Sequence, residues 1–314
     1  MGTQLIDLIR SNDHLAISRV ISDIEFNKRL PEAFFPSIHS LSNNALRIGI
    51  TGPPGAGKST LTNQLIKYIL DDNKSVGVVA IDPTSPFTGG ALLGDRVRMN
   101  NYLFNENVFI RSMGSHGDLG GLAHKTQEVG DVLAASGKDI IIYEPVGVGQ
   151  GELDVSKAVD ITIVILVPES GDEVQLMKAG IIEIADIFVI NKCDRDGSDR
   201  LAASLKTILH SFTQNEKLEP KVFKTSANKG EGLDELYIGL NKLLLLMQNE
   251  GLLKQKKLER HRSRIFQLVQ DRLLNDFWTN KKTQELETSI KNINSTKVSH
   301  YEVVKKLFEK KNVR

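Results

Sequence analysis

The stretch that most constrains the fold is "GPPGAGKS", residues 52–59. It follows the apolar run "RIGIT" and precedes the helix-like segment "STLTNQLIKYIL". The pattern G-x-x-x-x-G-K-S/T between a strand and a helix is typical of a loop whose backbone N–H groups wrap a phosphate chain. A plain strand-to-helix turn needs neither the lysine nor the serine. We therefore predict a nucleotide phosphate site formed by Gly52, Pro53, Pro54, Gly55, Ala56, Gly57, Lys58, Ser59 and Thr60.

Two side chains of this loop are predicted to carry the chemistry. Lys58 is expected to reach the β- and γ-phosphates, and the hydroxyl of Ser59 is expected to ligate Mg²⁺. The sequence thus predicts a nucleoside triphosphate and Mg²⁺ as ligands.

Short apolar runs alternate with amphipathic stretches after the first 45 residues. The runs are continuous rather than alternating, which favours strands covered on both faces. We predict an α/β fold, a doubly wound and mostly parallel sheet of the P-loop NTPase type, with helical N- and C-terminal extensions. The strand-like runs are "LRIGIT", "SVGVVAID", "NVFIRS", "DIIIYE", "DITIVILV", "DIFVIN" and "KVFKTS".

The same pattern predicts three regions along the chain. Residues 1–45 are expected to be a helical extension, residues 46–248 the nucleotide-binding domain, and residues 249–314 a helical, charged arm. The basic run "KQKKLERHRSR" (254–264) is interpreted as a solvated helix face.

Composition narrows the partners and the compartment. The 314 residues carry a formal net charge of +1, so the overall charge supports neither a nucleic-acid nor an anionic-membrane partner. The single cysteine, Cys193, excludes a disulfide framework and fits a reducing compartment. No signal-peptide core opens the chain and no apolar run is long enough to span a bilayer, so we expect a cytoplasmic protein.

A second motif predicts which base is bound. "FVINKCD" ends in Asn191, Lys192, Cys193 and Asp194. In the pattern Asn-Lys-x-Asp the aspartate accepts from the ring N–H and the exocyclic amine of guanine, a two-point contact that adenine cannot match. Ser226 and Ala227, in "KTSANKG", are expected to form the supporting guanine loop.

Acids at strand ends are candidates for the metal. Asp82 ends the second strand-like run, and Asp95 closes the glycine-rich loop behind it, which we expect to order on Mg²⁺ and the γ-phosphate. Glu144 ends "DIIIYE" and is followed by Gly147, where most GTPases carry Asp-x-x-Gly. A glutamate adds roughly 1.5 Å of reach. We therefore interpret Glu144 as an acid that serves Mg²⁺ through a water molecule or through another ligand of the metal.

In combination these motifs resemble the MeaB/ArgK family of GTPases, of the SIMIBI class, which replace the usual aspartate by glutamate. The resemblance covers about residues 46–230 and rests on a series of blocks in the same order. They are "GPPGAGKST", "DPTSPFTGGALLGDRVRM", "LGGLAHKTQE", "EPVGVGQGE", "GDEVQLMKAGIIEIADIFVINKCD" and "SANKGEGLDEL". Tyr143 and Pro145 stand where the family pattern has Val and Thr, and His116 where many relatives carry Arg.

The resemblance implies a function and partners. It implies a GTP-hydrolysing chaperone that gates cofactor loading of an adenosylcobalamin-dependent acyl-CoA mutase, methylmalonyl-CoA mutase above all, and protects or reactivates it. It also implies a homodimer joined by the C-terminal arm. The chain lacks Asp-x-His-x-x-Gly, so any cobalamin is expected to come with the partner.

Catalysis is expected to be slow without that partner. Val148 stands where Ras-type enzymes carry the water-positioning glutamine, and Gln150 lies two residues further on. Lys178 matches the lysine of the family's third switch. It is expected to offset transition-state charge when the mutase docks, although solvation or pairing with Asp172 or Glu173 is the alternative.

Three other functions are compatible with a phosphate loop. A metallochaperone GTPase would carry His-rich or Cys-rich ligand sets, and the single cysteine and seven scattered histidines form none at metal spacing. A small-molecule kinase linked to amino-acid transport would not need Asn191 and Asp194. A purely structural nucleotide-binding protein would not need Lys58, Ser59 and the acids together.

Overall fold

The computed structural model describes residues 2–82, 102, 105–114, 119–145, 156–170, 181–212, 219–296 and 299–309. The chain forms two compact units, residues 1–260 and 261–314. The boundary falls inside the long helix α12 (Leu252–Phe277). The separate roles expected for residues 1–45, 46–248 and 249–314 stay predictions.

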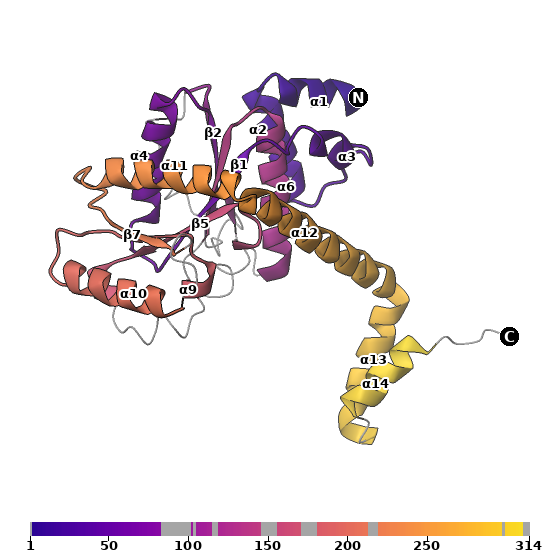
Figure 1. Ribbon diagram of the computed structural model, residues 1–314. Helices are drawn as coiled ribbons and strands as arrows, with labels where there is room; N and C mark the ends of the chain where they lie inside the picture. The colour runs from indigo at the N-terminus through magenta and orange to yellow at the C-terminus, as the bar shows by residue number, and fades with distance from the viewer. Residues whose placement is uncertain are drawn as a thin grey trace. The chain divides into compact units, whose positions relative to one another are not determined.

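A seven-stranded parallel sheet organises the first unit (Figure 1). Its strand order is β3-β2-β4-β1-β5-β6-β7, with the first strand near the middle. Each strand coincides with one of the seven apolar runs, and the predicted fold class is confirmed. Because all strands run parallel, their carboxyl ends share one edge, where the loops that bind ligands gather. The strands are β1 (Leu46–Thr51), β2 (Val76–Asp82), β3 (Val108–Gly114), β4 (Ile140–Glu144), β5 (Ile161–Leu166), β6 (Ile187–Ile190) and β7 (Lys221–Lys224).

One face of the sheet is covered by α4 (Lys58–Asp71) and α11 (Leu233–Asn249). Leu61 and Leu65 of α4 and Leu236 of α11 are fully buried against alternate strand residues. The two helices are also linked at their surface, where tyrosines donate hydrogen bonds to aspartates of the other helix or its cap. The bonds run from Tyr68 to Asp234 at 2.9 Å and from Tyr237 to Asp72 at 2.7 Å.

The other face of the sheet is covered by two sets of helices. One set is α1 (Gly2–Arg10), α2 (His14–Glu25), α3 (Phe34–His39) and α6 (Leu119–Ala135). The other set is α9 (Ile181–Ile184) and α10 (Ser198–Phe212), which pack near β5 and β6.

The three N-terminal helices belong to the same hydrophobic core as the sheet. Ile17, Val20 and Ile21 are at most 1% exposed and share a cluster with Val79 and Ile141 of the sheet. Asp13 starts α2 by accepting hydrogen bonds from the N–H groups of the helix's first turn. Helices were expected here, but their burial against the sheet could not be read from residues 1–45 alone.

The basic start of α12 contacts residues next to the strands, and the interpretation as a solvated face is wrong for the buried Arg260. The Lys256 ammonium pairs with Asp186 at 2.5 Å, and Lys257 donates to the Asn43 carbonyl at 3.2 Å. Arg260, 5% exposed, pairs with the fully buried Asp160. Asp186 directly precedes β6, and Asp160 directly precedes β5. The basic run therefore neutralises two carboxylates at the amino edge of the sheet.

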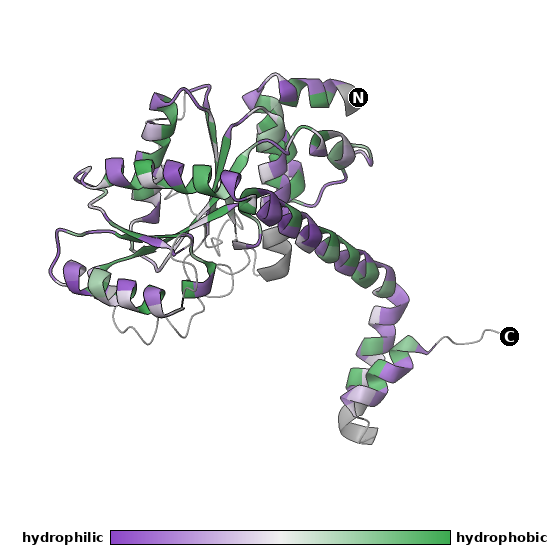
Figure 2. Cartoon of the chain, viewed as in Figure 1, coloured by the Kyte–Doolittle hydropathy of each residue, from purple (hydrophilic) through white to green (hydrophobic). Residues whose placement is uncertain are grey.

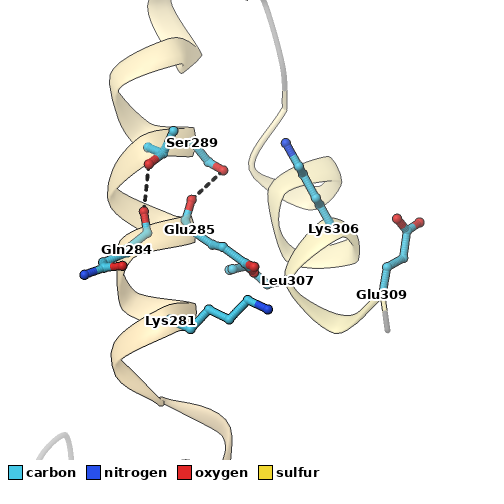
Figure 3. A pocket seen from close by; sticks show the side chains of 8 residues that line it. Lys281, Gln284, Glu285, Ser289, Lys306, Leu307 and Glu309 are labelled. Carbon is cyan, nitrogen blue, oxygen red and sulfur yellow. Dashed lines mark hydrogen bonds between the residues drawn. The ribbon is translucent and has the colours of Figure 1, made fainter. Parts of the chain in front are cut away.

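The second unit is helical. It contains the end of α12, then α13 (Asn280–Thr296) and α14 (His300–Phe308). Ser299 and Glu302 form a reciprocal capping box at the start of α14. A pocket of about 480 Å³ lies between α13 and α14, with charged side chains around it (Figure 3). Among the described residues, no helix is both long and apolar enough to cross a membrane.

Candidate nucleotide-binding site

The phosphate loop depends on glycine at two close approaches. Gly52 has φ +142°, and a Cβ there would lie 2.2 Å from the Ile165 carbonyl oxygen of β5. Gly57 has φ +93°, and its Cβ would lie 2.3 Å from the Asn191 amide nitrogen. A larger residue at either position would push the loop off the strand or off the base-reading segment. The loop therefore lies directly against β5 and Asn191.

Lys58 and Ser59 begin α4, where the loop ends. The Lys58 ammonium donates to the carbonyl oxygens of Gly52 at 2.9 Å and Pro53 at 3.2 Å, so this side chain arches back over its own loop. Ser59 is buried beneath it. A 14-residue helix that starts here adds the positive end of its dipole to the lysine charge, which favours a bound polyphosphate.

Glu144, the last residue of β4, faces α4. Its carboxylate is 4% exposed and accepts a 2.5 Å hydrogen bond from the Ser59 hydroxyl and a 3.3 Å one from the Thr62 hydroxyl. The preceding residue, Tyr143, points to the opposite face because strand side chains alternate. The structure thus brings the predicted metal serine and the predicted metal acid into direct contact.

The surroundings of Tyr143 explain why a tyrosine can stand where the family pattern has Val. Its fully buried ring lies against Gly130 of α6, where a Cβ would be 1.7 Å from the tyrosine hydroxyl. The hydroxyl also accepts from the Arg47 guanidinium at 3.4 Å. A glycine in the facing helix therefore makes room for a tyrosine next to Glu144.

Asn191 joins the phosphate loop to the supporting guanine loop. Its amide nitrogen donates to the Ala56 carbonyl at 2.8 Å. Its amide oxygen accepts from the Ala227 backbone N–H at 3.0 Å and the Thr225 hydroxyl at 3.2 Å. Asn191 is 3% exposed, and every one of these bonds is local to the predicted site. Its role here is to set the distance between the phosphate loop and the base-reading loop.

Asp194 is exposed at the mouth of this region. One carboxylate oxygen accepts from the Ser226 hydroxyl at 3.0 Å, and the other lies 3.1 Å from the Lys229 ammonium. The hydrogen bonds from Lys229 and Ser226 lower the pKa of Asp194, so it is ionised at neutral pH and can accept from two N–H groups of guanine. Lys192, between Asn191 and Asp194, adopts φ +57°, a left-handed turn that brings the two into one loop.

The structure places Asp82 at the end of β2. Asp95, Gly147 and Lys178 lie outside the described residues, as do His116, Val148 and Gln150. The sequence motifs do not include three residues that contact predicted site residues. Thr62 contacts Glu144, Thr225 contacts Asn191, and Lys229 contacts Asp194. The position of Thr62, one helical turn after Ser59, was the available signal. In the described part of the chain, no group of three or more His, Cys, Asp or Glu side chains is arranged to hold a metal.

The side chains present fit a guanine nucleotide and Mg²⁺. The glycine cradle and the start of α4 suit a polyphosphate, and Asp194 suits the guanine edge. Oxygen donors are what Mg²⁺ requires, and Ser59 with Glu144 supplies them at the loop's end.

Parallel sheet, phosphate loop and base-reading segment together define a P-loop GTPase. Comparison with known proteins agrees. The family description "Methylmalonyl Co-A mutase-associated GTPase MeaB" matches residues 16–282. A GTPase of Pyrococcus abyssi is 40% identical over 304 residues, covering 96% of this chain and 94% of its own length. GTPase ArgK of Escherichia coli is 31% identical over 281 residues, covering 87% and 85%.

Two further likenesses extend this picture. The mouse mitochondrial methylmalonic aciduria type A homolog is 37% identical over 243 residues, which cover 76% of this chain and 59% of that protein. The crystal structure of an LAO/AO transport system kinase has the same fold, with a TM-score of 0.72 at 23% identity, covering 97% and 95% of the two chains. The chain belongs to the MeaB family of GTPases. It binds guanine nucleotide and hydrolyses GTP.

Proposed function

We propose that this GTPase is a chaperone of an adenosylcobalamin-dependent acyl-CoA mutase, methylmalonyl-CoA mutase above all. Family membership carries the proposal, since the matching description is that of a mutase-associated GTPase. The mouse relative named for methylmalonic aciduria points to the same chemistry. In this role, GTP binding and hydrolysis by the chaperone control when the mutase is loaded with its cofactor.

The residues of this chain divide the work. Lys58 and the loop N–H groups bind the phosphates, and Asn191 and Asp194, supported by Ser226 and Ala227, hold guanine. Ser59 and Glu144, with Asp82 and Asp95 from the neighbouring strand and loop, would hold Mg²⁺. When bound, Mg²⁺ offsets charge on the phosphate oxygens. Gly147 follows Glu144 closely enough for the loop there to respond to loss of the γ-phosphate.

Nucleotide choice tests the assignment of Asp194. Calorimetry with the purified protein should show GDP binding and much weaker ADP binding, because adenine lacks the two N–H groups from which this carboxylate accepts in guanine. Asp194→Asn should shift preference toward xanthine nucleotides, whereas Asp196→Asn, an exposed neighbour in the same turn, should not. Equal affinity for GDP and ADP would refute the assignment.

The mutase proposal is tested by association and by stimulated hydrolysis. The GTPase should co-elute with methylmalonyl-CoA mutase in a nucleotide-dependent way, bind no free adenosylcobalamin, and hydrolyse GTP faster when the mutase is present. We propose that Lys178 supplies part of this stimulation, a contribution worth on the order of 10³-fold or more in comparable GTPases. Lys178→Ala should abolish most of the stimulation and spare nucleotide affinity, while Lys206→Ala, an exposed lysine of α10, should change neither.

Failure to co-elute under any nucleotide would argue against a mutase partner. A normal stimulated rate in Lys178→Ala would instead remove only the role of that lysine.

A homodimer through the second unit completes the proposal. After Leu252 and Leu253 the first half of α12 is mostly hydrophilic, while its later turns carry more hydrophobic residues (Figure 2). Ile265, Phe266, Val269 and Leu273 are 50–66% exposed, and their spacing places them on one stripe of the helix. An exposed stripe of four large apolar side chains is typical of a protein–protein contact, and we assign it to a second copy of the chain.

Sedimentation measurements test the dimer. The protein should sediment as a dimer, and Phe266→Glu with Leu273→Glu should give a folded monomer. Ile238→Glu, at a comparably exposed apolar residue of α11, should leave the dimer intact. A monomeric parent protein would contradict the proposal.

A further inference from the structure

Thr62 makes a contact that no sequence motif assigns to it. It lies in the second turn of α4, is fully buried, and donates from its hydroxyl to Oε2 of Glu144 at 3.3 Å. Ser59, three residues earlier on the same helix, donates to Oε1 at 2.5 Å. Residues three apart lie on one helix face, so both oxygens of one carboxylate are held by consecutive turns of α4.

This double contact fixes an orientation that a glutamate would not keep by itself. The last torsion of a glutamate side chain is broad and roughly two-fold, so one hydrogen bond leaves the carboxylate free to turn. A second donor on the other oxygen restricts that rotation. Glu144 has few alternatives, because it is 4% exposed and a buried carboxylate oxygen without a donor is costly.

The contact also explains the glutamate at this position. From the end of β4 the carboxylate lies between the first and second turns of α4. An aspartate is shorter by one methylene and would reach less far toward the second turn. Thr62 and the glutamate therefore belong together as one arrangement.

The hydroxyl of Ser59 has one proton and two lone pairs. When the proton points at Glu144, the hydroxyl oxygen can donate a lone pair to a cation. The orientation of the Glu144 carboxylate thus bears on the orientation of the Ser59 hydroxyl, and the hydrogen bond from Thr62 restricts the rotation of that carboxylate.

We propose that Thr62 is a positioning residue for Mg²⁺-dependent nucleotide binding: it holds Glu144 so that Ser59 presents its oxygen to the metal. The inference rests on the proposed use of Mg²⁺ at Ser59 and Glu144. It predicts that loss of the Thr62 hydroxyl weakens the response to Mg²⁺ and spares nucleotide binding without metal.

The test compares three variants with the parent protein. Thr62→Val removes the hydroxyl at nearly constant volume, and Thr62→Ser keeps it. Thr51→Val is the matched control: Thr51 is 1% exposed at the end of β1, and its hydroxyl has no hydrogen-bond partner among the described residues. Thermal unfolding by circular dichroism establishes that each variant is folded.

The main measurement is the release of fluorescent GDP across a Mg²⁺ titration and in EDTA. Thr62→Val should need about tenfold more Mg²⁺ to slow release, the size of effect seen when a partner of a metal ligand is lost. Its release rate in EDTA should match the parent. Thr62→Ser should restore the parent's Mg²⁺ requirement, and Thr51→Val should not alter it.

Two results would overturn the inference, and they differ from failure of the proposed function. If Thr62→Val responds to Mg²⁺ as the parent does, Thr62 has no positioning role. If it speeds release equally in EDTA and in Mg²⁺, the hydroxyl serves only the fold. If the parent itself releases GDP at one rate with and without Mg²⁺, the proposed metal site is wrong, and the role of Thr62 is refuted with it.

Discussion

Two buried carboxylates, Glu144 and Asp160, lie at opposite edges of the sheet and are held by different chemistry. Glu144, at the carboxyl edge, accepts from the hydroxyls of Ser59 and Thr62. Asp160, at the amino edge before β5, accepts from the Arg47 backbone N–H at 2.9 Å and pairs with the guanidinium of Arg260. Glu144 thus accepts from two neutral donors of one helix, whereas Asp160 pairs with a cation 100 residues away in the sequence.

The surroundings of Asp160 extend this charge pairing. Arg47 is 4% exposed and also pairs with Asp131 of α6, and burial together with Arg47 lowers the pKa of Arg260. An arginine keeps its charge under such conditions, so the cluster holds charges of both signs. Hydroxyl donors can rearrange around an arriving cation at little cost, whereas a buried ion pair cannot. The difference separates a carboxylate placed for ligand binding from one placed for the fold.

The largest expected effect is on the fold side. Asp160→Asn removes the carboxylate that pairs with the buried Arg260 guanidinium, and we expect a loss of about 3–5 kcal/mol in the free energy of unfolding. Urea denaturation measures it. The same substitution at Asp276, whose pair with Arg272 is exposed on both sides, should have no measurable effect. Equal stability of the Asp160→Asn variant and the parent would break the comparison.

The second prediction reverses the outcome at the other edge. Glu144→Gln keeps the size of the side chain, and its amide can accept from one hydroxyl and donate to the other, so stability should change by less than about 1 kcal/mol. GTP hydrolysis should fall roughly 10- to 100-fold, because the charge beside Ser59 is gone. Single-turnover assays measure the rate, with Glu287→Gln on α13 as an exposed control. A variant with full activity and reduced stability would show that Glu144, like Asp160, serves the fold rather than ligand binding.

The third prediction concerns Tyr143, which precedes Glu144 in β4 and whose hydroxyl accepts from Arg47 of the charged cluster around Asp160. Gly130→Ala puts a methyl group into the tyrosine hydroxyl and should cost about 1–3 kcal/mol. Tyr143→Val, the residue of the family pattern, should remove most of that cost in the double variant. A double-mutant cycle in urea gives the coupling directly, and additive effects would show that the two residues do not oppose each other.

The smallest effect is expected at Lys138, whose ammonium is buried and donates to the Glu106 carbonyl at 2.8 Å. Burial lowers the pKa of Lys138 to about 8 from an ordinary 10.5. Between these values the unfolded chain keeps a proton that the folded protein has released, so this lysine makes the free energy of unfolding rise with pH across that window. Below pH 8 its buried charge opposes folding.

Lys138→Met should remove this rise. The difference in stability between variant and parent should change by about 1 kcal/mol from pH 7 to 10, after allowing for solvent screening. Urea titrations at several pH values measure it, with Lys206→Met as the exposed control. A constant difference across the window would show that Lys138 has an ordinary pKa.

Much of the fold and part of the site were predictable because the signal is local. The phosphate loop, the seven strands and the Asn-Lys-x-Asp segment each lie in short continuous stretches, and a period or a spacing is enough to recognise them. The contact between Ser59 and Glu144 was implied by their separate motifs but not shown by them. The role of Thr62 could not be predicted, because a threonine within a helix belongs to no nucleotide-binding motif and its contact with Glu144 joins residues far apart in the sequence.

The sequence by itself determined the class of fold, the nucleotide and the order of the motifs. Backbone chemistry leaves little choice where glycine, lysine and serine follow a buried strand. Only the tertiary structure decided that α1, α2 and α3 complete the core, that Arg260 neutralises Asp160, and that Thr62 orients Glu144. These contacts join residues that are distant in the chain, and their energies depend on burial and mutual orientation, which exist only once the sheet and its helices have packed.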